Sequence, residues 1–300
     1  MYNGKTNNFT MVGTNPATSN VTTTIPVYLI PVKTTFTKGG VKTTYDPAKV
    51  LSNGLTTITA TTSSPIFQNV NYVQGGTSLG NTQYLDAYQR GNFWTNVMTN
   101  TSYHVLLGTP TVLATQTLAV PTNEGTTATE FGVKTGLINI NWWDIQANSY
   151  IKKFSQITPS SLVIFVTYNT YLSENSGSSG CCIGGYHSAT GSQTYMHYAY
   201  IDHSGAFSQD ISALSHEVGE WMDDPLVNNT QGACGGLLEN GDPLEGFANY
   251  GTFPVTLNGI TWHPQDLVFL KYFGQTPSTS VNNWWSFNNA NITSVCQYGQ

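Results

Sequence analysis

The order of apolar and polar residues along the chain predicts many short strands and three helices. Residues 161–168 are apolar almost throughout, which is typical of a strand buried on both faces of a sheet. Residues 25–33 form a second apolar run, and the prolines within it favour an edge or first strand. Further strands are predicted at 104–107, 111–120, 136–141 and 194–202, and helical spacing predicts helices over 82–98, 143–154 and 210–223.

This mixture of strands and helices predicts an α+β fold. Residues 1–24 are rich in Thr, Asn and Gly without periodicity, so we expect them to form an extended N-terminal arm or linker. Residues 25–300 contain neither an internal repeat nor a clear linker. We therefore predict a single domain over 25–300.

Composition narrows the class of protein. Only 9% of the residues are charged, against about 25% in a typical soluble domain, and Thr, Ser, Asn, Gln and Gly take their place. This is typical of a secreted, β-rich protein, and we expect that its secretion signal has been removed. The net charge is −6 with ten scattered basic residues, which argues against nucleic acid as a partner. No apolar run reaches the roughly 20 residues of a membrane span.

The four cysteines fit no Cys-x-x-Cys spacing of a zinc or redox site. An even number in such a chain predicts two disulfides. Cys181 and Cys182 are adjacent, and neighbouring Cα atoms about 3.8 Å apart are too close for an ordinary disulfide. We therefore expect each of them to pair with Cys234 or Cys296.

Acidic residues are concentrated in one region. Between Lys153 and Lys271 the chain has no Lys or Arg. Carboxylates gathered without compensating cations imply a missing counterion, for which a bound metal is the natural choice, although a solvated acidic surface is the alternative. Eight of the 16 acidic residues lie in this region within 36 positions: Asp210, Glu217, Glu220, Asp223, Asp224, Glu239, Asp242 and Glu245.

The helix predicted over 210–223, with Asp210 or Ser212 as its N-cap, carries the candidate metal ligands. His216 and Glu220 are four residues apart, so their side chains lie on one face. Glu217 adjoins them and could act as a general base. The pattern is that of the His-Glu-x-x-His zinc helix with a carboxylate in place of the second imidazole. Zinc accepts such an oxygen, and calcium or manganese become better candidates as oxygen ligands accumulate. A solvent-facing His-Glu pair on an amphipathic helix is the alternative.

A family resemblance rests on several strings. Ser-His-Glu-Val-Gly-Glu-Trp-Met-Asp-Asp-Pro at 215–225 and Glu-Asn-Gly-Asp at 239–242 resemble secreted bacterial proteins with Ser-His-Glu-x-x-Glu-x-x-x-Asp-Pro and then Glu-x-Gly-Asp. These are distantly similar to the exordium (phosphate-induced) proteins of plants, which are associated with growth and cell walls. Cys-Cys-Ile-Gly-Gly-Tyr-His at 181–187 and Thr-Gln-Tyr-Leu-Asp-Ala-Tyr-Gln-Arg at 82–90 also match. The group is inferred to be metallopeptidase-like from its helix.

The resemblance implies a zincin-like fold and makes Glu239 the third metal ligand. Asp242 is the alternative third ligand. Asp224 could instead hydrogen-bond to a ligand without contacting the metal itself. The sequence departs from the group in one respect, because members often have a cysteine shortly after Glu-x-Gly-Asp, whereas Pro243 follows here.

Other residues have more than one interpretation. His187 and His203 could be metal ligands, oxyanion stabilisers or packed loop residues. His263 and Tyr250 could polarise a substrate carbonyl. Aromatic residues at 195–200 and 284–287 could line a sugar-binding groove or pack in the core.

The leading hypothesis is a secreted, zinc-dependent endopeptidase-like hydrolase acting on a protein or peptide. His216, Glu220 and Glu239 would hold the ion, and Glu217 would accept a proton from the attacking water. The alternative is an extracellular structural or adhesive protein with a structural metal, which self-associates when its N-terminal arm lends a strand to a neighbour. A weaker alternative is binding of cell-wall glycan.

Overall fold

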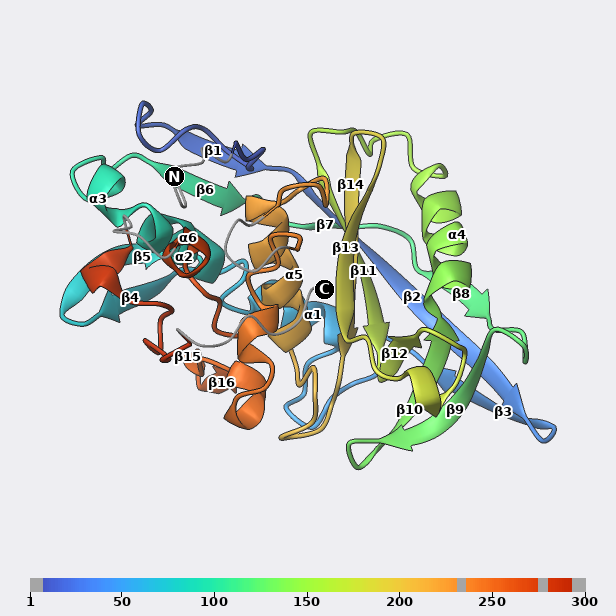
Figure 1. Cartoon of the computed structure of the whole chain (residues 1–300). Coiled ribbons are helices and arrows are strands. Elements are labelled where there is room, and N and C mark those ends of the chain that lie inside the picture. The colour runs from blue at the N-terminus through green and yellow to red at the C-terminus, as the bar shows by residue number, and fades with distance from the viewer. Residues whose placement is uncertain (1–7, 231–235, 275–279, 293–300) are drawn as a thin grey trace.

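A seven-stranded sheet occupies one side of the molecule (Figure 1). The computed structural model describes residues 8–230, 236–274 and 280–292. The sheet has the order β13 (Gly185–Thr190), β14 (Gln193–Tyr200), β11 (Leu162–Tyr168), β2 (Val27–Lys38) and β3 (Val41–Tyr45), with β7 (Thr111–Val112) and β8 (Gln116–Ala119) also paired to β2. β11 runs parallel to both β14 and β2, whereas β13 and β3 pair antiparallel with their neighbours.

The centre of the sheet follows directly from the apolar run that predicted it. Every residue of β11 is buried, as expected for a strand covered on both faces. The first apolar run, predicted as an edge or first strand, is β2, which comes first along the chain in this sheet but is not an edge, because it has partners on both sides. Pro31 lies opposite Val166, where the pairing of β2 with β11 ends, so its missing N–H falls at the end of that ladder.

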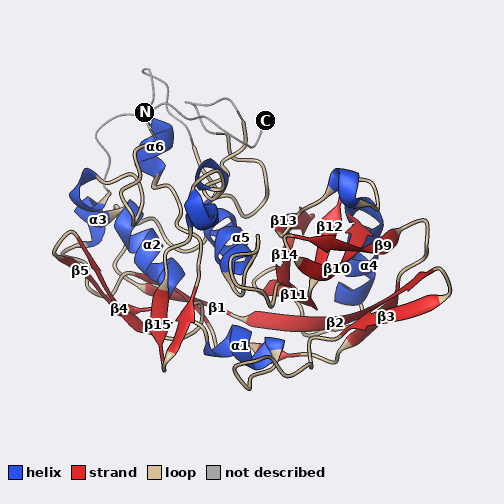
Figure 2. Cartoon of the chain, turned by 90° about the horizontal axis from the view of Figure 1, so that it is seen from below, coloured by secondary structure: helices blue, strands red, loops and turns tan. Residues whose placement is uncertain are grey.

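A smaller sheet and a helix cover one face of the large sheet. The smaller sheet has the order β12 (Thr170–Ser173), β10 (Val133–Asn139) and β9 (Gly125–Glu130). Helix α4 (Ile140–Ile151) inserts Trp143 against Phe165 and His197 of the large sheet. Both views place α4 on one side of β11 and β14 and α5 (Ser212–Asp223) on the other (Figures 1 and 2).

Helix α5 separates this sheet from a second group of short elements (Figure 2). This group comprises α2 (Tyr84–Asn92), α3 (Trp94–Val97), α6 (Leu270–Gly274), the parallel pair β1 (Thr22–Ile25) and β6 (His104–Leu107), and the hairpins β4 (Val70–Gln74) with β5 (Thr77–Thr82) and β15 (Val255–Leu257) with β16 (Ile260–Trp262). Helix α1 (Thr57–Ser63) instead contacts the large sheet, where the Thr61 hydroxyl meets the Tyr198 hydroxyl of β14. All twelve residues of α5 are buried. Its polar residues therefore face the protein interior, unlike those of an amphipathic surface helix.

The predicted helices and strands are present, with shifted boundaries. The helix predicted over 82–98 is divided at Phe93 into α2 and α3. Helix α5 begins at Ser212 after Ile211, and no side chain caps it, so the predicted N-cap is wrong. The Asp210 carboxylate is engaged elsewhere, 2.7 Å from Nδ1 of His263. The strand predicted at 111–120 is two short strands, β7 and β8.

The described part of the N-terminal arm lies against the rest of the chain. The Val12 N–H donates to the Met222 carbonyl oxygen over 2.9 Å, and the Tyr103 hydroxyl donates to the Thr14 carbonyl oxygen over 3.2 Å. Self-association through the arm stays a prediction. None of the helices in the described part of the chain has both the length and the apolar character that crossing a bilayer requires.

The expected disulfide pairing is wrong for the adjacent cysteines. Cys181 and Cys182 are bonded to each other, with their Cα atoms 2.9 Å apart across a cis peptide bond. The usual Cα separation of disulfides is a statistical range, and this bonded pair lies outside it. Cys234 and Cys296 lie outside the described residues.

A buried carboxylate joins α2 to the end of α5. Asp223 accepts hydrogen bonds from the Tyr88 hydroxyl, from the Gln89 and Asn92 amides and from the Asn240 amide. Burial raises the pKa of Asp223 to about 7, although these four donors oppose the rise.

We expect Asp223→Asn to lower the free energy of unfolding by about 1–3 kcal/mol. The asparagine NH₂ group would face donors where a carboxylate oxygen now accepts. Urea denaturation of the variant measures the change. Glu174→Gln, at an exposed position, is the control and should change stability by less than about 0.5 kcal/mol. An equal effect of both substitutions would contradict the role of the network.

Candidate metal centre

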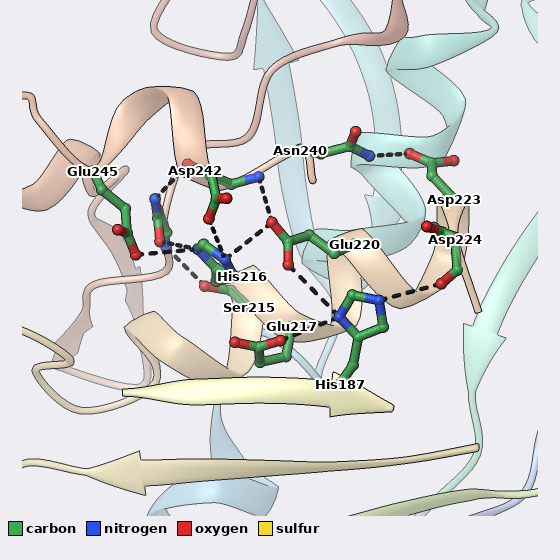
Figure 3. Close-up of polar contacts among 12 residues, drawn as sticks. His187, Ser215, His216, Glu217, Glu220, Asp223, Asp224, Asn240, Asp242 and Glu245 are labelled. Carbon is green, nitrogen blue, oxygen red and sulfur yellow. Dashed lines mark hydrogen bonds and ion pairs between the residues drawn. The ribbon is translucent and has the colours of Figure 1, made fainter. Parts of the chain in front are cut away.

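One turn of α5 presents three ionisable side chains in the protein interior (Figure 3). His216, Glu217 and Glu220 are only 6%, 4% and 2% exposed. Nε2 of His216 lies 3.0 Å from Oε1 of Glu220, the neighbour expected from a spacing of four residues. The helix therefore brings an imidazole and a carboxylate together as the sequence predicted.

The edge strand β13 adds a second histidine. Nδ1 of His187 lies 3.3 Å from Oε2 of Glu217 and 3.6 Å from Oε2 of Glu220 (Figure 3). Nε2 of His187 lies 3.2 Å from the carbonyl oxygen of Asp224. His187, Glu217 and Glu220 each offer one ligand atom, and these atoms lie within 4.8 Å of one another. This buried group could hold a metal ion.

The loop after α5 brings further carboxylates to the same place. Oδ1 of Asp242, which begins the short helical turn Asp242–Leu244, lies 3.4 Å from Nε2 of His216. Glu239 lies beside Glu220, and burial together with the charge of Glu220 raises the pKa of Glu239 to about 9. Oε1 of Glu245 lies 3.8 Å from Nδ1 of His216, so His216, Asp242 and Glu245 form a second group of ligand atoms within 4.8 Å.

The predicted ligands are thus neighbours, but they do not form one set. His216 and Glu220 are in contact, and Glu239 adjoins Glu220. Among the described residues, Glu239 belongs to none of the three groups whose ligand atoms gather within 4.8 Å, two of which are at this site. Its role as third ligand stays a prediction. Asp224 contacts His187 through its backbone carbonyl oxygen, and Oδ2 of its buried carboxylate has no hydrogen-bond partner within the part of the chain that the structure describes.

The pKa values of the site residues are shifted in the directions that favour added positive charge. Burial raises the pKa of Glu217, and it raises the pKa of Glu220 to about 7. Burial lowers the pKa of His216, but the charge of Glu220 and hydrogen bonds to Asp242 and Glu220 outweigh it and raise that pKa well above its ordinary value. The pKa of His187 is raised as well, since its contacts with Glu217 outweigh burial. A bound divalent cation would supply positive charge to these buried carboxylates.

A cavity of about 200 Å³ opens beside α5. One part of its wall is polar and is made by His216, Glu217, Asp242, Glu245 and Gln265. Another part is apolar and includes Cys182, Ile183 and Phe207. His216 and Glu217 therefore face a space that a substrate or water could enter.

Gln265 fixes the orientation of the His216 ring. Its Oε1 lies 2.7 Å from Nδ1 of His216, and its Nε2 donates to the Gly241 carbonyl oxygen over 2.9 Å. Its backbone N–H donates to Oγ of Ser215 over 2.7 Å. Such a partner commonly sets the tautomer and direction of a metal-binding histidine. No sequence pattern identified Gln265, because a lone glutamine 49 residues after His216 carries no periodic or spacing signal.

Glycines make room for the site side chains. A Cβ on Gly241 would lie 2.6 Å from Cε1 of His216, and a Cβ on Gly185 would lie 2.7 Å from Oε1 of Glu217. The Gly241 N–H also donates to Oε1 of Glu220 over 3.0 Å. At φ −87° Gly241 has a backbone that alanine can adopt, so the effect of a substitution there is steric.

We expect Gly241→Ala to weaken metal binding about 10–100-fold, by displacing the His216 ring. Competition with a chromophoric chelator measures the Kd for zinc. Gly177→Ala is the control, because a Cβ there would meet its nearest neighbour only at 4.0 Å. Equal zinc affinity in the two variants would show that the contact of Gly241 with His216 does not matter for binding.

The remaining candidates lie outside the cluster. His203 is exposed, and His263 pairs with Asp210. Tyr250 packs against Phe207. Of the two aromatic segments, the first is buried in β14, and Phe287 of the second packs in the core against Tyr84.

The chain was also compared with models of protein families, with characterised proteins and with solved structures, and no match was found.

Proposed function

We propose that this protein is a zinc-dependent endopeptidase-like hydrolase with a zincin-like arrangement of α5 against the edge strand β13. One observation carries the proposal. His216 and Glu217, consecutive residues of a buried helix, form part of the wall of a cavity, and Glu220 and Glu239 lie next to them. A proposed metal ligand, His216, and a second ionisable side chain, Glu217, thus border one accessible space.

His216, Glu220 and Glu239 are the proposed ligands. Their donor set of one imidazole and two carboxylates suits zinc, whereas calcium prefers oxygen ligands alone. The raised pKa values of the Glu220 and Glu239 carboxyl groups are consistent with a site built for a cation. Zinc bound here would polarise a peptide carbonyl and make a water molecule more acidic.

Glu217 acts as the general base in this proposal. Its carboxylate accepts a proton from the attacking water and then passes it to the leaving amine. His187, 3.3 Å from Oε2 of Glu217, holds that carboxylate in position. The substrate is a protein or peptide. The low charge and the disulfide support a location outside the cell.

Removal of the metal tests the proposal. We expect one zinc per chain by elemental analysis and hydrolysis of casein, with the hydrolysis lost after a chelator and restored by added zinc. Mock-treated protein carried through the same dialysis steps is the control. Calcium or no metal, with no hydrolysis, would contradict the proposal and favour a structural protein.

A further inference from the structure

Four aromatic side chains meet beside the cavity and form what we call the aromatic patch: Phe131, Tyr171, Phe207 and Tyr250. The ring of Phe207 is at the centre, with centroids 5.3 Å from Tyr250, 5.7 Å from Phe131 and 6.1 Å from Tyr171. Phe131 and Tyr250 also contact each other at 6.0 Å. The four residues come from segments far apart in the sequence, so the patch is a product of the tertiary fold.

The aromatic patch is continuous with the cavity of the candidate metal centre. Phe207 lines that cavity together with Cys182, His216 and Glu217. Both cysteines of the disulfide pack against the same apolar cluster as Phe207 and Tyr171. The apolar wall therefore begins in the space that Glu217 faces and continues from Phe207 to Phe131 and Tyr250. Tyr171 is fully buried and packs against Phe207 from within the protein.

Two members of the patch have an unusual backbone. Phe131 (φ 48°) and Gly132 (φ 80°) form the two-residue turn between β9 and β10. Such turns favour Asn-Gly, because both residues have positive φ. Tyr250 has φ 53°. Bulky residues are uncommon in this region, and such strain concentrates at functional sites and ligand clamps.

Phe131 is also 45% exposed despite its three ring contacts. Residues with positive φ in two-residue hairpin turns are usually Asn, Asp or Gly, which are small or polar. Here the turn presents to solvent an apolar ring that contacts Phe207 of the cavity wall.

We propose that the aromatic patch and the Cys181–Cys182 disulfide bind a bulky apolar side chain of a polypeptide substrate, adjacent to the peptide bond that faces Glu217. The position of that bond rests on the proposed function. Removing an apolar side chain from water against rings and sulfur atoms favours Phe or Leu over Ala on general grounds. The patch would therefore determine which bonds are cleaved.

Binding of matched peptides tests this inference without requiring turnover. Two capped pentapeptides, with Phe or Ala at the central position, are titrated against the zinc-loaded Glu217→Gln variant by calorimetry. We expect the Phe peptide to bind at least about 10-fold more tightly. When Phe131→Ala or Phe207→Leu is combined with Glu217→Gln, the ratio of the two Kd values should fall close to one. Phe131→Ala is suited to this test because the Phe131 side chain is partly exposed.

Phe247→Ala is the matched control, since Phe247 is another exposed phenylalanine (38%) outside the aromatic patch. It should leave the ratio unchanged. A ratio close to one with the patch intact, or a ratio that survives both patch substitutions, overturns the inference.

Cleavage of the same peptides by wild-type protein separates this inference from the proposed function. Selective binding of the Phe peptide without cleavage of either peptide would support the subsite and contradict the peptidase. Equal kcat/KM for both peptides would support the peptidase and contradict the subsite.

Discussion

Glu217→Gln is expected to keep its zinc and to lose nearly all peptide hydrolysis. The glutamine amide has the shape of the carboxylate but cannot accept a proton from water. Loss of a general base lowers kcat by about 10²–10⁴-fold, and KM should change little because the cavity keeps its shape. Elemental analysis and steady-state kinetics on the same preparation measure both quantities.

Glu174→Gln is the matched control for this experiment. Glu174 is an exposed carboxylate that does not line this cavity. Because it has no proposed role in metal binding or proton transfer, we expect kcat to stay within about threefold of wild type, far from the loss that a missing base causes. Full turnover in Glu217→Gln would refute the mechanism. Loss of zinc in Glu217→Gln would instead mark Glu217 as a ligand.

The two histidines of the site should respond differently to alanine substitution. His216→Ala removes a proposed ligand, so zinc and hydrolysis should both be lost after dialysis. His187→Ala should keep one zinc per chain and lower kcat about 10–100-fold, since His187 positions the Glu217 carboxylate. Elemental analysis and casein hydrolysis on parallel preparations check both variants.

The same two variants also distinguish a metal site that includes His216 from one that includes His187. Zinc kept in His216→Ala and lost in His187→Ala would place the ion between His187, Glu217 and Glu220, whose ligand atoms lie within 4.8 Å of one another. His203→Ala is the control, because His203 is exposed and should affect neither zinc content nor hydrolysis.

Much of the fold could be predicted because periodic patterns are local. The apolar run 161–168 is the buried strand β11, and helical spacing located α4 and α5 to within a few residues and predicted one helix where α2 and α3 lie. The prediction of an edge for the first apolar run was wrong, because partners on both sides of a strand depend on which segments return to it. Strands such as β9 and β13 were not predicted, because their sequences are short and polar and have little periodicity.

The sequence by itself determined that a histidine and a glutamate lie side by side on one helix, within a segment rich in carboxylates and free of Lys and Arg. Helical spacing and charge depend only on neighbouring positions. The tertiary structure alone decided that His187 and Gln265 contact these residues, that the adjacent cysteines bond to each other, and that an aromatic patch continues the cavity. These contacts join segments far apart in the chain, so strand pairing and the paths of loops determine them.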